Sequence, residues 1–324
     1  MALDHNELPV YARDFLSYMD TIRNCSPNTM REYFYDVRIF LRFLKMHKLG
    51  DKRPFDEITV NDLGLDVIAG TNLSDMYAYM TYLSRSRGAS SRSRARKAAT
   101  VKSFYKYLFS KAKLIPSNPA QELESPRLSK ELPRYLSLEE SKALLAGIDG
   151  RYHSRDFAII IILLNCGLRV SELVGINTNH IRDNDTLVVR GKGNKDRTIY
   201  LNDACIFAIN EYLKVRPKAS ADDPNALFLS MQGKRISRKT IHYTLKKYFL
   251  KAGLDAEKYS AHKLRHTAAT LMYRYGNVDI RALQGILGHK SISTTEIYTH
   301  VDNEKLRKAV ESNPLSGIRP GDKK

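Results

Sequence analysis

The sequence predicts a mainly α-helical protein of two domains, with a small β-hairpin or sheet in the C-terminal domain. Apolar residues recur at three- and four-residue steps over most of the chain, which is the helical period. One pair of β-type runs flanks a Gly-Lys-Gly-Asn turn within residues 186–201. A cluster of prolines interrupts the helical pattern near residue 120, and 324 residues exceed the usual size of one domain.

The N-terminal part contains three segments with the apolar period of an amphipathic helix. They cover residues 8–22, 30–44 and 73–83. Ser26 followed by Pro27 provides an N-cap and a proline at the first helical position of the second segment. We therefore expect a helical bundle at this end of the chain.

A fourth helical segment occupies the second half of a strongly basic stretch over residues 85–113. The sequence has no acidic residue between Asp75 and Glu122. An apolar stripe shares the segment with lysines that lie on another face, which favours contact with phosphates over an ordinary solvated surface of mixed charge. The candidate DNA-binding residues are Arg92, Arg94, Arg96, Lys97, Lys102 and Lys106.

Prolines mark the boundary between the domains. They occur at positions 116, 119, 126 and 133, and each one disfavours helix at the residue before it. The sequence thus predicts an N-terminal domain over residues 1–115, a linker over 116–133 and a C-terminal domain over 134–324.

The C-terminal part begins with a capping box. Ser137 precedes Glu140 by three residues, which predicts a helix start. A longer helix is expected to end at Gly167, since glycine is the usual residue just after a helix. The hairpin follows, and from Ile206 onward the period is helical again apart from the short NALFLS segment.

Composition narrows the class of partner. Lys and Arg outnumber Asp and Glu 53 to 35, giving a formal charge of +18 and a pI near 9.7. Such an excess of positive charge is typical of a protein that binds a polyanion. Nucleic acid is favoured over an anionic membrane, because no apolar run approaches the length of a membrane span. The first residues lack the pattern of a signal peptide, so we expect a cytoplasmic protein. The cysteines are odd in number and lack C-x-x-C spacing, which predicts reduced thiols rather than disulfides or a zinc ribbon.

The stretch SAHKLRHTAATLMY, residues 260–273, places two histidines and an arginine close together on a helix. His262 and His266 have the spacing of zinc ligands on one helix face. Lys263 and Arg265 stand beside them, and two cations next to a divalent metal would repel it, so we predict no metal site. Cations and imidazoles instead suit an anion such as a phosphodiester.

Four short motifs follow one another along the C-terminal part: GLRVSEL, GKGNKDR, HKLRH and LGHKSISTTEIYTH. In this order and spacing they resemble the active-site motifs of tyrosine recombinases, the phage-integrase family, and within it those of the Xer recombinases that resolve chromosomes. The resemblance covers nearly the whole chain and departs from the family pattern at none of the active-site positions. The matching residues are Arg169, Lys192, His262, Arg265, His289 and Tyr298.

The residue types agree with the chemistry that the resemblance implies. A tyrosine can attack phosphorus and form a covalent phosphotyrosine, which makes Tyr298 the expected nucleophile. Arginines bind non-bridging oxygens in pairs of hydrogen bonds, while Lys192 can protonate the leaving 5′ oxygen. His262 and His289 can both donate hydrogen bonds to the phosphate, and the sequence leaves open which of the two is the general base. Glu172 and His266 are expected to support these groups.

The resemblance also implies a two-domain clamp around duplex DNA. Four protomers, of one chain or of this chain with a second recombinase, would exchange strands at two sites through a Holliday junction. No cofactor is expected, because transesterification conserves the bond energy. The biological role, resolution of chromosome dimers or integration and excision of DNA, stays open, as does a DNA translocase partner. The alternatives are a type IB topoisomerase, a non-enzymatic DNA-binding protein and a zinc hydrolase.

Overall fold

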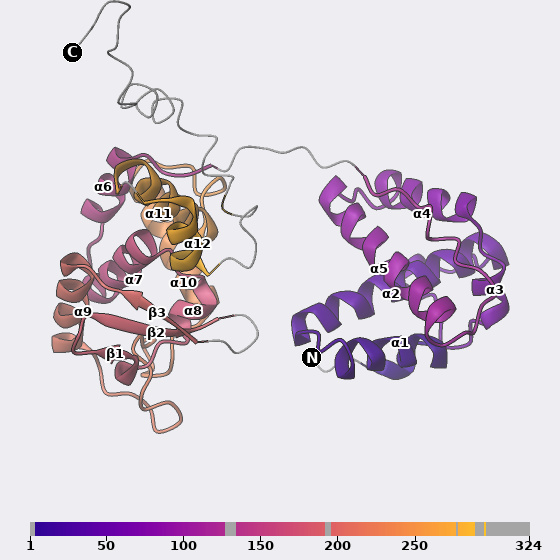
Figure 1. The fold of residues 1–324 in the computed structure, drawn as a ribbon, viewed down its shortest axis with the longest axis horizontal. Coiled ribbons are helices and arrows are strands. Elements are labelled where there is room, and N and C mark those ends of the chain that lie inside the picture. The colour runs from indigo at the N-terminus through magenta and orange to yellow at the C-terminus, as the bar shows by residue number, and fades with distance from the viewer. Residues whose placement is uncertain (1–3, 127–133, 192–195, 277, 289–294, 296–324) are drawn as a thin grey trace, which may run out of the picture. The chain divides into compact units, whose positions relative to one another are not determined.

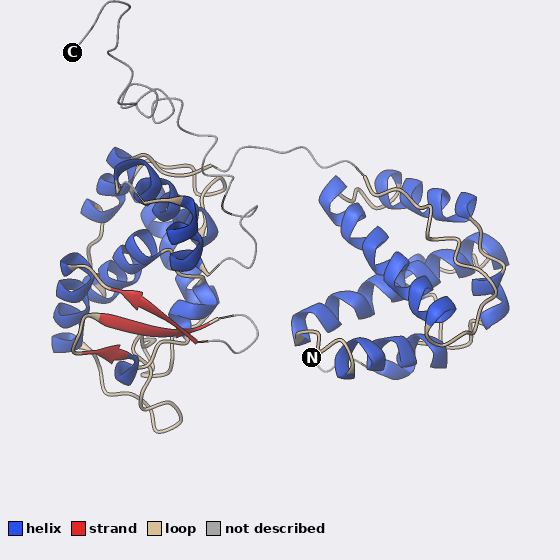
Figure 2. Cartoon of the chain, in the orientation of Figure 1, coloured by secondary structure: helices blue, strands red, loops and turns tan. Residues whose placement is uncertain are grey.

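The computed structural model describes residues 4–126, 134–191, 196–276, 278–288 and 295. The chain divides into two compact units, Met1–Lys130 and Glu131–Lys324. The described part is mostly helical with one small sheet, as the sequence predicts (Figures 1 and 2). No helix within these ranges is long and apolar enough to cross a membrane.

The first unit is a bundle of helices in which α2 and α5 pack against each other and against α1 and α4 (Figure 1). The expected helices are all present, and Ser26 Oγ caps α2 by accepting a hydrogen bond from Thr29 N at 3.3 Å. Capping by Asn72 and Asp75 at the start of α4 was not anticipated. The helical elements, with η for 3-10 helices, are η1 (His5–Glu7), α1 (Val10–Thr21), α2 (Pro27–Leu49), η2 (Phe55–Glu57), α3 (Leu65–Ala69), α4 (Leu73–Arg85) and α5 (Ser91–Ser110).

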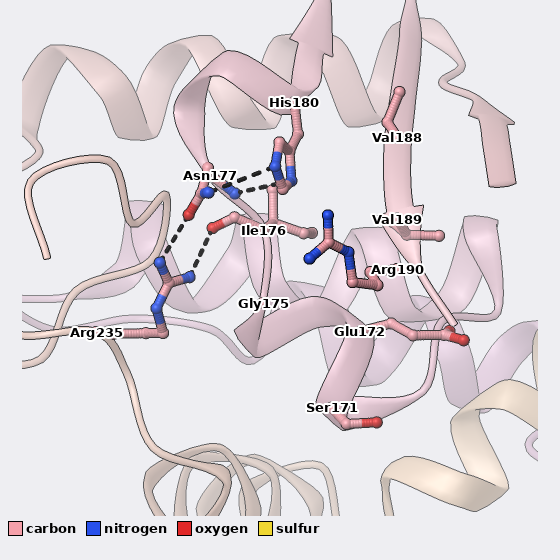
Figure 3. A pocket seen from close by; sticks show the side chains of 10 residues that line it. All are labelled: Ser171, Glu172, Gly175, Ile176, Asn177, His180, Val188, Val189, Arg190 and Arg235. Atoms are coloured by element: carbon pink, nitrogen blue, oxygen red, sulfur yellow. Dashed lines mark hydrogen bonds between the residues drawn. The ribbon is translucent and has the colours of Figure 1, made fainter. Parts of the chain in front are cut away.

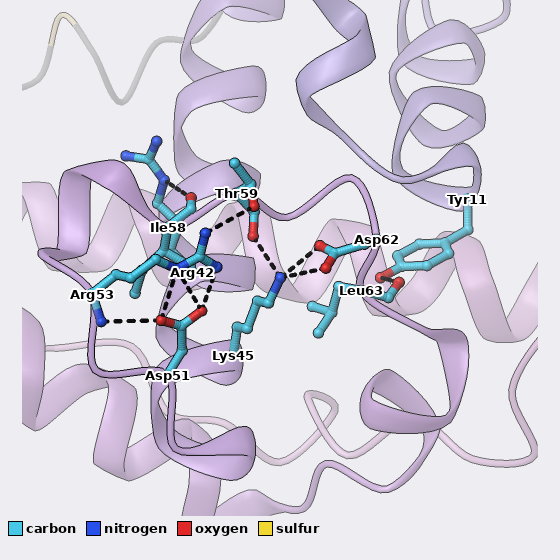
Figure 4. A network of polar contacts seen from close by, with 9 residues as sticks. All are labelled: Tyr11, Arg42, Lys45, Asp51, Arg53, Ile58, Thr59, Asp62 and Leu63. Atoms are coloured by element: carbon cyan, nitrogen blue, oxygen red, sulfur yellow. Dashed lines mark hydrogen bonds and ion pairs between the residues drawn. The ribbon is translucent and has the colours of Figure 1, made fainter.

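A polar network holds the segment after α2 against that helix (Figure 4). Lys45 Nζ donates to both carboxylate oxygens of Asp62, at 2.6 and 2.7 Å, and to the carbonyl of Thr59 at 3.0 Å. Arg42 Nε donates to the carbonyl of Ile58 at 2.9 Å. These bonds satisfy the backbone carbonyls of Ile58 and Thr59, which lie outside helices and strands.

The N-terminal core extends past the predicted domain end at residue 115. Ala120 and Leu123 are fully buried in the same apolar cluster as the helices of the first unit. The prolines on either side of these residues end the helical pattern, but Ala120 and Leu123 still pack against the bundle. The proline-rich stretch is therefore partly a piece of the first unit.

The second unit surrounds helix α7, whose apolar residues are buried along nearly its whole length. Helix α7 packs against α9 on one side and α11 on another, and α11 in turn packs on α12. Both backbone N–H groups of the predicted capping box at Ser137 and Glu140 are satisfied at the start of α6. The helices are α6 (Leu138–Ala146), α7 (His153–Cys166), α8 (Val170–Val174), η3 (Thr178–His180), α9 (Asp203–Val215), α10 (Arg238–Lys251), α11 (Ala261–Tyr275) and α12 (Ile280–Leu287).

One antiparallel sheet accompanies these helices, in the strand order β1-β2-β3. Strands β2 (Thr186–Arg190) and β3 (Asp196–Tyr200) form the predicted hairpin, with Val189 paired to Arg197. Strand β1 (Ile181–Arg182) was not predicted, because two residues are too few to show an alternating pattern. The sheet joins the helices through the contact of β2 with α8.

Candidate active site

The candidate site is organised by the carboxylate of Glu172, whose side chain is only 2% exposed. Helix α8 starts at Arg169, which serves as its N-cap, and Glu172 is the third helical residue. Glu172 Oε2 accepts from the backbone N–H of Arg169, and Oε1 accepts from its guanidinium, both at 2.8 Å. The predicted active-site arginine and its predicted support are thus locked together by a helix cap.

A third residue, Arg197 on β3, grips the same carboxylate. Its Nη1 lies 2.8 Å from Glu172 Oε1, and its Nη2 lies 3.0 Å from Oε2. Burial alone would raise the pKa of Glu172, but the hydrogen bonds from Arg169 and Arg197 and the charge of Arg197 outweigh burial and lower that pKa. Glu172 is therefore a carboxylate at neutral pH.

Arg265, on α11, closes this group from the other side. Its side chain is 2% exposed, with Nη1 donating to the carbonyl of Gly167 and Nη2 to the carbonyl of Leu287, each at 2.6 Å. Those carbonyls stand at the C-terminal ends of α7 and α12, where the helix dipole favours a cation. Arg265 Nη1 lies 3.9 Å from Glu172 Oε2, so three guanidinium groups gather around one carboxylate.

Gly167 makes this approach possible. Its φ of +59° confirms the predicted left-handed glycine at the end of α7. A Cβ at this position would lie 2.8 Å from Leu287 Cδ2 and 3.5 Å from the Cβ of Ala268. Only glycine combines this backbone conformation with the close packing of α7, α11 and α12.

The histidines of α11 lie one turn apart, as predicted. The rings of His262 and His266 meet edge to face with centroids 4.6 Å apart. Partial burial lowers the pKa of His262 below 6.5, and the positive charges of Arg265, Lys263 and Arg169 lower it further. The imidazole of His262 is consequently neutral at physiological pH and able to accept a proton.

Three predicted active-site residues, Lys192, His289 and Tyr298, lie outside the described residues. Their neighbours in sequence are described. Strand β2 ends at Arg190. Helix α12 ends at Leu287, and Gly288 after it has φ +64°, as the LGHK sequence predicts for a glycine that ends a helix just before His289. The sequence also predicts a helix over residues 303–312, and that segment lies outside the described residues too.

Helix α5 carries the predicted DNA-binding residues, and its apolar face is buried as expected. Lys97 departs from the prediction, because it is buried and its Nζ lies 2.6 Å from Oδ1 of the fully buried Asp36. Arg96 reaches the same carboxylate at 2.7 Å, and Arg94 is bonded to two serines. Asp36 on α2, which is distant in sequence, thus pairs with two of the cations, Arg96 and Lys97, that the sequence predicts to bind DNA.

Arg92 and Lys106 are exposed, and Lys102 is half-buried. Within the described ranges, none of the three has an ion-pair partner. These residues remain available to phosphates on the outer face of α5.

A pocket of about 360 Å³ lies beside the arginine group, between α8 and β2, and contains neither Arg169 nor Arg265 (Figure 3). Arg235, Asn177 and His180 in its lining are already paired. Arg235 donates to Asp223 at 2.5 and 2.6 Å and to Asn177 at 2.6 Å, and Asn177 also contacts His180. The chemistry of the site therefore belongs to the arginine group rather than to this pocket.

Arg197 is the residue that the sequence interpretation missed. The alternation along β3 contains the relevant signal. Arg197 is two residues from the buried Ile199, so both side chains lie on the inward face of the strand.

Over the described ranges no group of three or more His, Cys, Asp or Glu side chains could hold a metal ion. The buried Cys166 and Cys205, far apart in sequence, have their sulfur atoms 4.0 Å apart.

This arrangement places a neutral imidazole beside clustered arginines in a two-domain helical fold, which suits an enzyme that acts on a phosphodiester. Comparison with known proteins agrees. Residues 134–305 match the Phage integrase family, and residues 12–112 match the Phage integrase, N-terminal SAM-like domain family. The chain belongs to the phage integrase family and is a site-specific DNA recombinase.

Among its relatives is the tyrosine recombinase XerC of Caldanaerobacter subterraneus subsp. tengcongensis, 57% identical over 95% of this chain and 88% of that protein. The tyrosine recombinase XerD of Proteus mirabilis is 34% identical over 92% and 90% of the two chains. The integrase of transposon Tn1549, solved in complex with transposon right end DNA, has the same fold, with a TM-score of 0.71, 22% identity and coverage of 93% and 98%.

Proposed function

We propose that this recombinase cleaves one strand of a specific duplex site with Tyr298, and that its cellular role is resolution of chromosome dimers. The observation that carries the proposal is the convergence of Arg169 and Arg265 onto Glu172, beside the end of α12 that leads to His289. His262, on the same helix as Arg265, lies close enough to both arginines for their charges to lower its pKa. The relationship to proteins named XerC supports the cellular role.

In the proposed cleavage step, the phenol oxygen of Tyr298 attacks phosphorus. The Oη–P bond forms, the bond from phosphorus to the 5′ oxygen breaks, and the protein holds the 3′ phosphate. The phenol proton passes to the neutral imidazole of His262, and Lys192 donates a proton to the departing 5′ oxygen. A free 5′ hydroxyl from the partner strand then reverses the step and rejoins the DNA.

The arginines act on the charge that develops at phosphorus. Arg169 is 37% exposed, so donors that Glu172 does not use can reach a non-bridging oxygen. Arg265 is buried and held by two carbonyls, which fixes its guanidinium before DNA arrives. Donors fixed in advance stabilise a transition state without reorganising at the moment of reaction.

We further propose that four protomers, all of this chain or of this chain with a second recombinase, act on two DNA sites. Three cations of α5, the exposed Arg92 and Lys106 and the half-buried Lys102, would contact the DNA backbone in each half-site. These contacts supply affinity and register rather than sequence preference.

The test is to trap the covalent intermediate. The full chain is incubated with nicked fragments of genomic DNA, adducts are isolated under denaturing conditions, and the attached ends are sequenced. Wild-type protein is expected to give adducts at one recurring site, and Tyr298→Phe to bind that site without forming an adduct. An adduct with Tyr298→Phe would place the nucleophile elsewhere. Relaxation of supercoiled DNA without exchange between two sites would indicate a topoisomerase instead.

A further inference from the structure

Arg197 stands out among the basic residues of the second unit, because it contacts the active-site carboxylate yet is not one of the six residues assigned to the reaction, although it ends the GKGNKDR motif. Its side chain is 16% exposed, and both of its terminal nitrogens are bonded to Glu172. Its Nε is buried and has no hydrogen-bond partner among the described residues. A buried unpaired donor carries a desolvation cost, which suggests that the position is held for a functional reason.

The guanidinium of Arg197 also lies against the end of α12. A Cβ built on Gly288 would be 2.6 Å from Arg197 Nη1 and 3.2 Å from its Cζ. Gly288 follows Leu287, whose carbonyl binds Arg265. Arg197 thus occupies the space between Glu172 and the backbone that anchors the second active-site arginine.

Arg169 and Arg197 share one acceptor. Each places an Nη1 at 2.8 Å from the same oxygen, Glu172 Oε1. Arg197 holds the carboxylate through both terminal nitrogens, the geometry that makes arginine pairs strong. Among the described residues Arg169 makes a single side-chain bond, to Glu172, so its other donors stay available there.

The balance of charge around Glu172 has a consequence for the reaction. The guanidinium groups of Arg169, Arg197 and Arg265 surround one carboxylate, which leaves two positive charges in excess. A phosphodiester has one negative charge and gains another as the pentavalent transition state forms. Without Arg197, the carboxylate would cancel one of the two remaining cations and leave one for the phosphate.

We propose that Arg197 is a positioning residue for strand cleavage, which neutralises Glu172 so that Arg169 and Arg265 keep their charge for the scissile phosphate. The inference rests on the proposed function, because it assigns the phosphate to these two arginines. Arg197 acts through Glu172, and its contribution is charge balance at the site.

The experiment compares Arg197→Met with wild type on the duplex site recovered by adduct trapping, under single-turnover conditions. On the ordinary phosphodiester, cleavage should slow by about 10- to 100-fold, less than the loss expected for a direct donor. On the same duplex with a methylphosphonate at the scissile position, which lacks the negative charge of one oxygen, the deficit should shrink to about threefold or less.

Two further variants test charge against geometry. Arg197→Lys keeps the charge but not the paired hydrogen bonds, so it should recover most of the rate. The double variant Glu172→Gln with Arg197→Met removes both the negative charge of Glu172 and the cation that neutralises it. It should therefore cleave faster than Arg197→Met alone. Such coupling is expected only between residues that act on each other.

Arg235→Met is the matched control. Arg235 also binds a carboxylate through two nitrogens: its Nε and Nη2 donate to the two oxygens of Asp223, in a partly exposed position. Its loss can lower stability, which thermal melting records for every variant. Any deficit of Arg235→Met should be the same on both substrates.

The outcomes separate clearly. An equal deficit of Arg197→Met on phosphodiester and methylphosphonate, with no recovery in the double variant, would show a purely structural role and overturn the inference. Recovery on a 5′-bridging phosphorothiolate instead would assign Arg197 to the leaving-group acid and overturn it as well. Failure of the proposed function would look different, because wild-type protein itself would form no adduct.

Discussion

Replacing Gly167 by alanine should damage both the stability of the second unit and its cleavage activity. The backbone at Gly167 has φ +59°, and a left-handed L-residue costs about 1–2 kcal/mol. The new Cβ would also lie 2.8 Å from Leu287 Cδ2, and overpacking of this kind costs about 1–3 kcal/mol. Together these effects predict a loss of about 2–5 kcal/mol in the free energy of unfolding.

Gly253→Ala provides the matched comparison. Gly253 follows α10 with φ +71°, and a Cβ there would meet no atom within 4 Å, so only the cost of about 1–2 kcal/mol from the backbone applies. For a unit of this size, about 1 kcal/mol corresponds to 2–4 °C in melting temperature. Gly167→Ala should therefore melt about 2–12 °C below Gly253→Ala.

The same substitution should disturb the chemistry. The carbonyl of Gly167 binds Arg265 at 2.6 Å, and a shift of about 1 Å in such a group can cost about 100-fold in rate. Single-turnover cleavage is measured at a temperature where both variants are folded. Equal melting temperatures and equal cleavage rates for the two variants would refute the reasoning about the packing at Gly167.

Three other predictions concern separate parts of the molecule. Asp36→Ala should destabilise the first unit by about 3–5 kcal/mol in urea unfolding, because it leaves the buried Lys97 without its partner, and an unchanged midpoint would contradict this. Lys102→Ala with Lys106→Ala should reduce the slope of log affinity against log salt by about two, whereas Lys97→Met should not. Since the pKa of His262 is lowered from 6.5, the neutral base persists below that pH, and the acid limb of the second-order cleavage rate should have its midpoint under 6.5; a midpoint above 6.5 would count against His262 as the base.

Local signals account for the parts of the fold that the sequence alone predicted. Ser26, Ser137 and the glycines at 167 and 288 start or end helices through contacts with residues a few positions away, which are visible in a linear sequence. The apolar stripe of α5 and the β2–β3 hairpin follow from short periods of the same kind. The match to the recombinase motifs depends on order and spacing, which are also linear properties.

Contacts between distant segments were decided only by the tertiary structure. Lys97 belongs to a run of cations in the sequence, yet Asp36 on another helix draws it into the core. Arg197 is 25 residues from Glu172 and resembles an ordinary strand residue until α8 and β3 are placed side by side. Pairing energies between charges depend on distance and burial, and neither is fixed until the chain has folded.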